Sequence, residues 1–306
     1  MPETTTTSID DAVRKYVAES RYVMQERPGV IFAFLRSENL PKGQGSTVNI
    51  PKYGTVNTTA LTEGVDMASA QEITDTNTAL TPSEYGGQVI LTDMMLDTVK
   101  DEFFRVAGKL LGEGFDRQRE QTLADDMANF SVIIGSAGTA LNVGHVMAGY
   151  ASIKYNAPAA GVAGRGGEPA PDPVALFQTP AAIHSLRKSM VGHVAGAVVQ
   201  ASGGTASMGA APSLGGAPAH TGFMVDDVTV HSSINFNKDT SDDVVGGLLS
   251  KEGIITATLG GGPDAEKERD SSLRAWELNF VGRWGRVEYN DAWGRAVTMD
   301  SALPGA

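Results

Sequence analysis

The chain has 306 residues, of which 41% are hydrophobic and 20% charged, a composition typical of a soluble globular protein with one large core or two modest ones. Its formal net charge of −12 argues against a nucleic-acid binder, because such proteins carry basic stripes that neutralise phosphates. The absence of cysteine excludes disulfides, zinc–thiolate sites and thiolate catalysis. No apolar run approaches the roughly 20 residues that span a bilayer, and the first residues lack the order of a signal peptide. We therefore expect a protein of a cytoplasm-like space with no membrane partner.

The first predicted element is an amphipathic helix. Ile9, Val13 and Val17 recur at helical spacing within residues 9–26, and a Pro-Gly pair would end the helix. A short apolar run and a loop, SENLPKGQG, follow. This leading part, residues 1–45, has the pattern of an arm.

A long β-hairpin is predicted next. Residues 46–53 alternate as a strand does, residues 54–79 hold few large apolar groups, and strand-like alternation resumes near Tyr85 and from Val89 to Leu91. An isolated hairpin is marginal in water. It must therefore lie on a neighbouring subunit or fold back on its own domain.

A very long helix follows the hairpin. Thr92 and Asp93 are good caps for a helix from about Met94 to Ala128. Glycines at 108, 112 and 114 each cost about 1 kcal/mol of helix propensity, which indicates a close approach of another backbone or a kink. The residues that share one helical face are Val99, Phe103, Val106 and Leu110.

The second half of the chain predicts an α/β region and then a strand-rich tail. Glycine- and alanine-rich tracts at 156–171 and 201–222 are predicted to be long surface loops. An acidic stretch, PDAEKERDS, is expected to be a loop before the tail. The tail holds all three tryptophans, and such a concentration of aromatic residues is typical of a core. Helices are expected at 143–155 and 181–190, and strands at 174–177, 223–234, 244–249, 254–259 and 276–299.

None of the common catalytic motifs occurs in the sequence, and the five histidines are scattered without metal-ligand spacing. The stretch from Asn235 to Asp243 imitates a calcium loop but has Thr240 and Gly246 where glycine and glutamate are needed, so we interpret it as an acidic surface turn. The pair at 125–126 reads as a solvated helix edge. We expect no catalytic residue, no cofactor and no metal.

The order of elements resembles the major capsid protein of tailed bacteriophages, the Hong Kong 97 fold. The most specific text is LTEGVDMASAQEITDTNTALTPSEYGGQVILTD at 61–93, which is similar to the junction between the hairpin and the long helix in one branch of that family. KEGIITAT at 251–258 is similar to a late strand of the family's axial domain. The resemblance implies an α+β subunit that assembles into shells.

The resemblance also implies a division of the chain and a set of partners. The partners would be copies of the chain in pentamers and hexamers, a separate scaffolding protein, a portal and a decoration protein, in a virion assembled in the host cytoplasm around double-stranded DNA that is held without sequence-specific contacts. The implied parts are an N-terminal arm (1–45), an extended loop (46–84), a peripheral domain with a spine helix (85–140), an axial domain (141–272), and the returning peripheral strands with the tail (273–306).

Three functions remain open from the sequence: a phage capsid protein, an encapsulin-like nanocompartment shell of the same fold, and an α/β enzyme without a recognisable motif. The long hairpin and the absent motifs favour the first two. The residues predicted to contact a neighbouring subunit are Tyr53, Leu61, Glu63, Val65, Met67, Ile73 and Tyr85.

Overall fold

The computed structural model describes residues 29–41, 45–54, 72–94, 102–156, 167–198, 223–260 and 263–302, together with positions 43, 56, 58, 60, 63 and 64. The predicted helix at 9–26 and most of the two glycine-rich tracts lie outside these residues. Within the described ranges, none of the helices combines the length and the apolar character needed to cross a bilayer.

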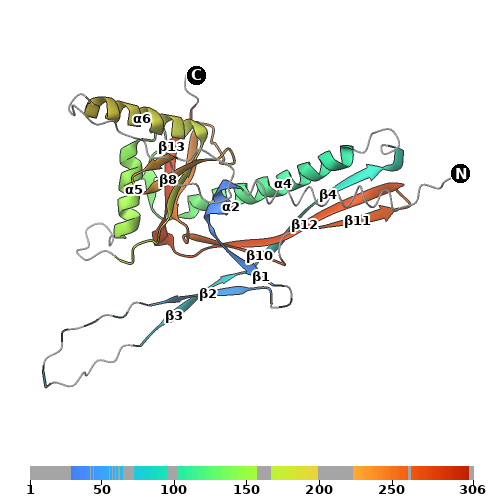
Figure 1. Cartoon of the computed structure of the whole chain (residues 1–306), viewed down its shortest axis with the longest axis horizontal. Coiled ribbons are helices and arrows are strands. Elements are labelled where there is room, and N and C mark those ends of the chain that lie inside the picture. The colour runs from blue at the N-terminus through green and yellow to red at the C-terminus, as the bar shows by residue number, and fades with distance from the viewer. Residues whose placement is uncertain are drawn as a thin grey trace.

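Three parts extend in different directions from one centre (Figure 1). An α/β body lies at one end, a long sheet with the helix α4 beside it extends away from the body, and a thin two-stranded arm projects separately. The fold is mixed helix and sheet, as the sequence predicts.

The body is built on a six-stranded mixed sheet with the order β5-β13-β9-β6-β8-β7. Its central strand β6 has the sequence VALFQ and is buried at every position. Its apolar side chains pack on both faces of the sheet, and the Gln178 amide donates a hydrogen bond to the Val297 carbonyl. The strands are β5 (Ile133–Gly135), β6 (Val174–Gln178), β7 (Phe223–Val225), β8 (Val228–Ser232), β9 (Asp243–Ser250) and β13 (Gly294–Asp300).

Helices cover both faces of this sheet. Val174 and Leu176 pack in a core with α5 (Val143–Tyr155) and α6 (Pro180–Val198). Ala175 and Phe177 point the other way, into a core with α2 (Val30–Phe34), the end of α4 and the short helix η1 (Met127–Asn129). The expected caps are confirmed: Asn142 accepts the His145 amide at 3.0 Å, and Pro180 opens α6.

The long sheet contains five strands, of which β4, β10 and β11 pair with β12 and β1 pairs with β10. The order is β1-β10-β12-β11, and β4 pairs antiparallel with β12 from Ser83 opposite Trp284 to Thr92 opposite Ala275. Its strands are β1 (Arg36–Leu40), β4 (Ser83–Thr92), β10 (Ile254–Leu259), β11 (Asp264–Asp270) and β12 (Ala275–Glu288). Another short helix, η2 (Asp291–Trp293), connects β12 to β13.

The long helix α4 (Glu102–Asp126) packs along this sheet at two glycines. A Cβ placed on Gly87 would lie 3.0 Å from Leu111, and one placed on Gly282 would overlap the Phe115 ring. The glycines of β4 and β12 therefore provide the space into which the helix inserts its apolar side chains. On the helix itself Gly108 and Gly112 are buried and Gly114 is exposed, and the helix continues unbroken through all three.

The arm differs from the prediction in its second strand. The partner of β2 (Val48–Tyr53) is β3 (Asp75–Leu80), antiparallel from Val48 opposite Leu80 to Tyr53 opposite Asp75. The segment near Tyr85 pairs with β12 instead, because its apolar side chains face α4 and the core. Alternation alone does not say which of two candidate strands closes a hairpin.

Two segments expected as loops are strands. Residues 36–40 pair in parallel with β10, with Leu40 buried and Arg36 bound to Glu38 and Glu252. The acidic text at 264–270 is the edge strand β11. Charged side chains are common on exposed edge strands, where they oppose unwanted pairing, so an acidic composition alone does not indicate a loop.

The two sheets do not follow the predicted boundaries at 141–272 and 273–306. Strands β10 and β11 belong to the five-stranded sheet, together with β4 and β12, whereas β13 belongs to the six-stranded sheet of the body. The chain passes from the five-stranded sheet to the six-stranded sheet between β4 and β5, returns between β9 and β10, and passes back between β12 and β13. A division by residue number does not coincide with the sheets, because each sheet takes its strands from distant parts of the chain.

Candidate subunit interface

The root of the arm is fixed to the long sheet by a small core. Leu80 is 1% exposed and packs with Ile50, Leu40, Ile255 and Ala257. The Tyr289 hydroxyl donates a hydrogen bond to the Pro51 carbonyl at 3.3 Å, and Lys52 lies over the Trp293 ring. The root therefore folds back on its own subunit, which was the alternative interpretation of this segment.

Beyond its root the arm exposes large apolar side chains. Tyr53 is 66% exposed, Val56 56% and Ile73 68%. Because Ile50 and Lys52 take the face of β2 toward the long sheet and η2, Tyr53 lies on the opposite face. Burying a side chain of this size contributes about 1.5–3 kcal/mol, so contact with another surface would be favourable here.

The remaining predicted interface residues divide into three groups. Glu63 is exposed, as Tyr53 and Ile73 are. Tyr85 is engaged within its own subunit, since its ring centre lies 5.5 Å from that of Trp284 and it packs on the core. The residues outside the described part of the chain are Leu61, Val65 and Met67.

A buried charged joint links α2 to α4. The Glu120 carboxylate accepts the backbone N–H groups of Ile31, at 3.2 Å, and Phe32, at 2.9 Å. These are free donors at the start of α2, whose N-cap Gly29 supplies no side-chain oxygen. The neighbouring Arg119 donates to Asp116 and lies 3.6 Å from the centre of the Phe32 ring.

Burial sets the protonation of this joint. It raises the pKa of Asp116 to about 6, although the Arg119 guanidinium opposes the shift. Burial also raises the pKa of Glu120, against the hydrogen bonds from Phe32 and Ile31, and lowers the pKa of Arg119, against the attraction of Asp116 and Glu120. The three side chains therefore depend on one another for their charged forms.

The sequence analysis missed this joint. The text FDRQRE contains charges at i, i+3 and i+4 of a helix, which is the usual pattern of a solvated face. Its one local signal is the apolar run VIFAF after a Pro-Gly pair, because a short helix with a glycine at its N-cap needs an acceptor from elsewhere. The expectation for Asp126 was also wrong: this carboxylate is ion-paired with Arg286 of β12.

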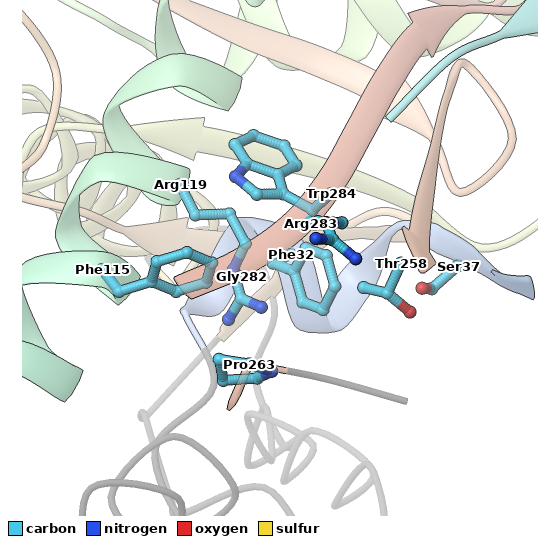
Figure 2. A pocket seen from close by; sticks show the side chains of 9 residues that line it. All are labelled: Phe32, Ser37, Phe115, Arg119, Thr258, Pro263, Gly282, Arg283 and Trp284. Atoms are coloured by element: carbon cyan, nitrogen blue, oxygen red, sulfur yellow. The ribbon is translucent and has the colours of Figure 1, made fainter. Parts of the chain in front are cut away.

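A small cavity adjoins the joint. It measures about 140 Å³, and Figure 2 shows the side chains of Phe32, Phe115 and Trp284 around that of Arg119. Pockets for substrates usually measure about 300–1,000 Å³, so this space suits a single side chain better than a small molecule. In the described part of the chain no group of histidine, aspartate and glutamate residues is placed to hold a metal ion.

The imitation of a calcium loop is a hydrogen-bonded turn. Asp239 accepts the amides of Ser241 and Asp243 with one carboxylate oxygen, both at 2.8 Å. Lys238 pairs with Asp242 across the same turn. These contacts explain why acidic residues gather here, and they form the turn that the sequence predicts.

Comparisons with known proteins identify the fold. Neither the family models nor the curated proteins contain a match to this chain. Among solved structures, the head structure of Helicobacter pylori bacteriophage KHP40 matches with a TM-score of 0.66 and 9% identity, over 87% of this chain and 88% of that one. The capsid of Ralstonia phage GP4 matches with a TM-score of 0.63 and 13% identity, over 93% and 92% of the two chains.

A shell of another kind has the same fold. The holo-SrpI encapsulin complex from Synechococcus elongatus PCC 7942 matches with a TM-score of 0.59 and 9% identity, over 91% of both chains. The chain therefore has the Hong Kong 97 fold of capsid proteins, as the resemblance implied. At such low identity the likeness establishes the fold alone.

Proposed function

We propose that this chain is a major capsid protein, which self-assembles through pentamers and hexamers into the icosahedral head of a tailed bacteriophage around double-stranded DNA. The observation that carries the proposal is the arm, which is anchored at its root and exposes Tyr53, Val56 and Ile73 beyond it. An exposed apolar arm on a subunit with this fold is suited to contact between subunits.

The charge of the chain supports the proposed content of the shell. At a net charge of −12, the protein repels phosphates rather than gripping them, which suits a container for DNA without sequence-specific contacts. The role is structural rather than catalytic. The further partners are a scaffolding protein, a portal and a decoration protein. The protein is located in the virion, which is assembled in the host cytoplasm.

We propose that the domains correspond to the two sheets rather than to continuous ranges of residues. The five-stranded sheet with α4 would be the peripheral domain, and the six-stranded sheet with α5 and α6 the axial domain. A nanocompartment shell with protein cargo is the second candidate, favoured by the encapsulin match of similar quality.

Shortening the arm tests the proposal. The Gly54 amide donates to the Thr74 carbonyl at 2.8 Å, so residues 55–73 can be replaced by an Asn-Gly turn without disturbing β2 and β3. The shortened chain should keep its Tm within about 3 °C and fail to form closed shells in electron micrographs. A matched chain with 55–73 replaced by a Gly/Ser linker of equal length separates loss of side chains from loss of length.

Purified full-length particles then separate the two candidates. Shells that contain nuclease-protected double-stranded DNA after production in infected cells support the phage head. Shells filled with protein and free of DNA support the nanocompartment, and a persistent monomer with catalytic turnover would contradict both.

A further inference from the structure

The cavity beside the charged joint has the size of one aromatic ring. Its volume is about 140 Å³, and an engineered cavity of about 150 Å³ holds a molecule of benzene. The rings of Phe32, Phe115 and Trp284 lie in its wall around the Arg119 side chain (Figure 2). Aromatic rings attract one another in edge-to-face and offset arrangements, and a guanidinium group is attracted to the face of a ring. The cavity therefore fits an aromatic side chain in both size and chemistry.

The cavity is open to the surface of the subunit. Among its lining residues Ser37 and Arg283 are exposed, and Phe32 and Phe115 are half-buried. A side chain that enters past Ser37 can reach the aromatic wall without unfolding the subunit. The occupant can therefore come from another molecule.

Buried N–H groups in the wall favour an occupant with an uncharged acceptor. The Arg119 Nε and Trp284 Nε1 atoms are buried and have no hydrogen-bond partner among the described residues, which is unfavourable. A carboxylate is a poor acceptor here, because Asp116 and Glu120 already oppose the charge of Arg119 and a further buried negative charge would be uncompensated. A phenol oxygen accepts a hydrogen bond without a charge, so the side chain that best suits this cavity is that of tyrosine.

The arm presents such a side chain. In the described ranges the exposed aromatic side chains are those of Tyr53, 66% exposed, and Tyr155, 57% exposed. Tyr53 ends β2 on the arm, which projects away from the other parts of the molecule (Figure 1), whereas Tyr155 ends α5 on the body. Val56 and Ile73 of the arm are exposed as well, so docking of the arm would bury further apolar area.

We propose that the cavity receives the Tyr53 side chain of a second copy of the chain. The ring would pack against Phe32 and Phe115, and its hydroxyl oxygen would accept a hydrogen bond from the Arg119 or Trp284 side chain. This inference rests on the proposed function, since it names the place on a neighbouring subunit to which the arm binds.

Photochemical cross-linking in assembled particles tests the occupant and keeps an aromatic ring at position 53. Tyr53→p-azidophenylalanine should give covalent dimers on irradiation, in which mass spectrometry finds residue 53 joined to the peptide that contains Phe32 and Ser37. Tyr155→p-azidophenylalanine is the matched control and should not label that peptide. Shells that form without this cross-link overturn the inference alone, whereas the absence of any association between subunits counts against the proposed function as well.

A small molecule tests the cavity on unassembled subunits. p-Cresol, which is the side chain of tyrosine as a free molecule, should bind the natural chain saturably in isothermal titration calorimetry. Ser37→Trp, which fills the mouth of the cavity, should weaken binding at least tenfold, and Ser241→Trp on the exposed turn of the body should leave it unchanged. Absence of binding to the natural chain, or equal binding to both variants, would overturn the inference whatever the cross-linking result.

Discussion

The most informative residue is Glu120, which satisfies two amides of an element 88 or more positions away. Its burial is tolerable because Arg119 lies beside it and because the start of α2 supplies N–H donors and the positive end of a helix. The joint therefore holds the start of α2 against α4. A substitution at Glu120 should affect the stability of both helices.

Replacing Glu120 by alanine should lower the free energy of unfolding by about 1–3 kcal/mol, because two buried amides lose their acceptor. Urea denaturation measures the loss. The matched control is Glu113→Ala on the same helix, whose partly exposed pair with Lys109 at 3.8 Å should contribute less than about 0.5 kcal/mol. Equal losses in both variants would contradict the role of the joint.

Asp116 should make stability depend on pH. Because its folded-state pKa is raised from 3.8 to about 6, the folded state holds the proton more tightly than the unfolded state. Its favourable contribution is complete below about pH 4 and is lost as pH rises through 6. The Tm of the natural chain minus that of Asp116→Asn should therefore fall between pH 4 and pH 7. Asp264→Asn on the exposed edge strand is the control, and a difference that rises with pH would refute the assignment.

At the scale of elements, the arm combines a buried root with an exposed continuation. Its root is part of a core, with Leu80 at 1% exposure, and its continuation exposes Ile73 at 68%. The pairing of the two strands ends where Tyr53 lies opposite Asp75 and Gly54 opposite Thr74, and Tyr53 is already exposed. The buried and the exposed apolar residues of the arm are therefore separated along the chain.

Two alanine substitutions test the buried and the exposed part of the arm separately. Leu80→Ala should lower the free energy of unfolding by about 2–5 kcal/mol, as for other buried leucines. Ile73→Ala should leave folding within about 0.5 kcal/mol and weaken assembly. Thermal denaturation and light scattering measure the two effects, and a destabilised Ile73→Ala subunit would show that the exposed side chain belongs to the fold.

Sequence reasoning succeeded where one chain segment decides its own structure. The buried run at β6, the Asn142 cap and the long helix follow from local pattern. It failed where pairing depends on distant partners: β3 was hidden in a polar stretch, and β11 in an acidic one. The charged joint was missed for the same reason, because it depends on the packing of α2 against α4, where Phe32 lies over Arg119.

At the scale of the molecule, apolar contact through the arm and the repulsion between net charges have opposite effects on association. The apolar arm favours association, whereas subunits of net charge −12 repel one another. Screening acts over roughly 10 Å at 0.1 M salt, so it affects the approach of subunits more than their packed contacts.

Assembly should therefore begin at lower protein concentration as salt rises. Between about 50 mM and 500 mM sodium chloride, the threshold measured by light scattering should fall several-fold. The shortened-arm chain should show no threshold at either salt concentration. A threshold that rises with salt would mean that attraction between opposite charges, rather than apolar contact, drives association.

The place of β13 has a consequence for synthesis. This strand lies between β5 and β9 in the body, yet the ribosome makes it after every other strand of both sheets. Until it emerges, the core lacks Val297, and β9 is paired with β6 alone and has a free edge along seven residues. A chain interrupted before β13 therefore cannot complete the six-stranded sheet of the body.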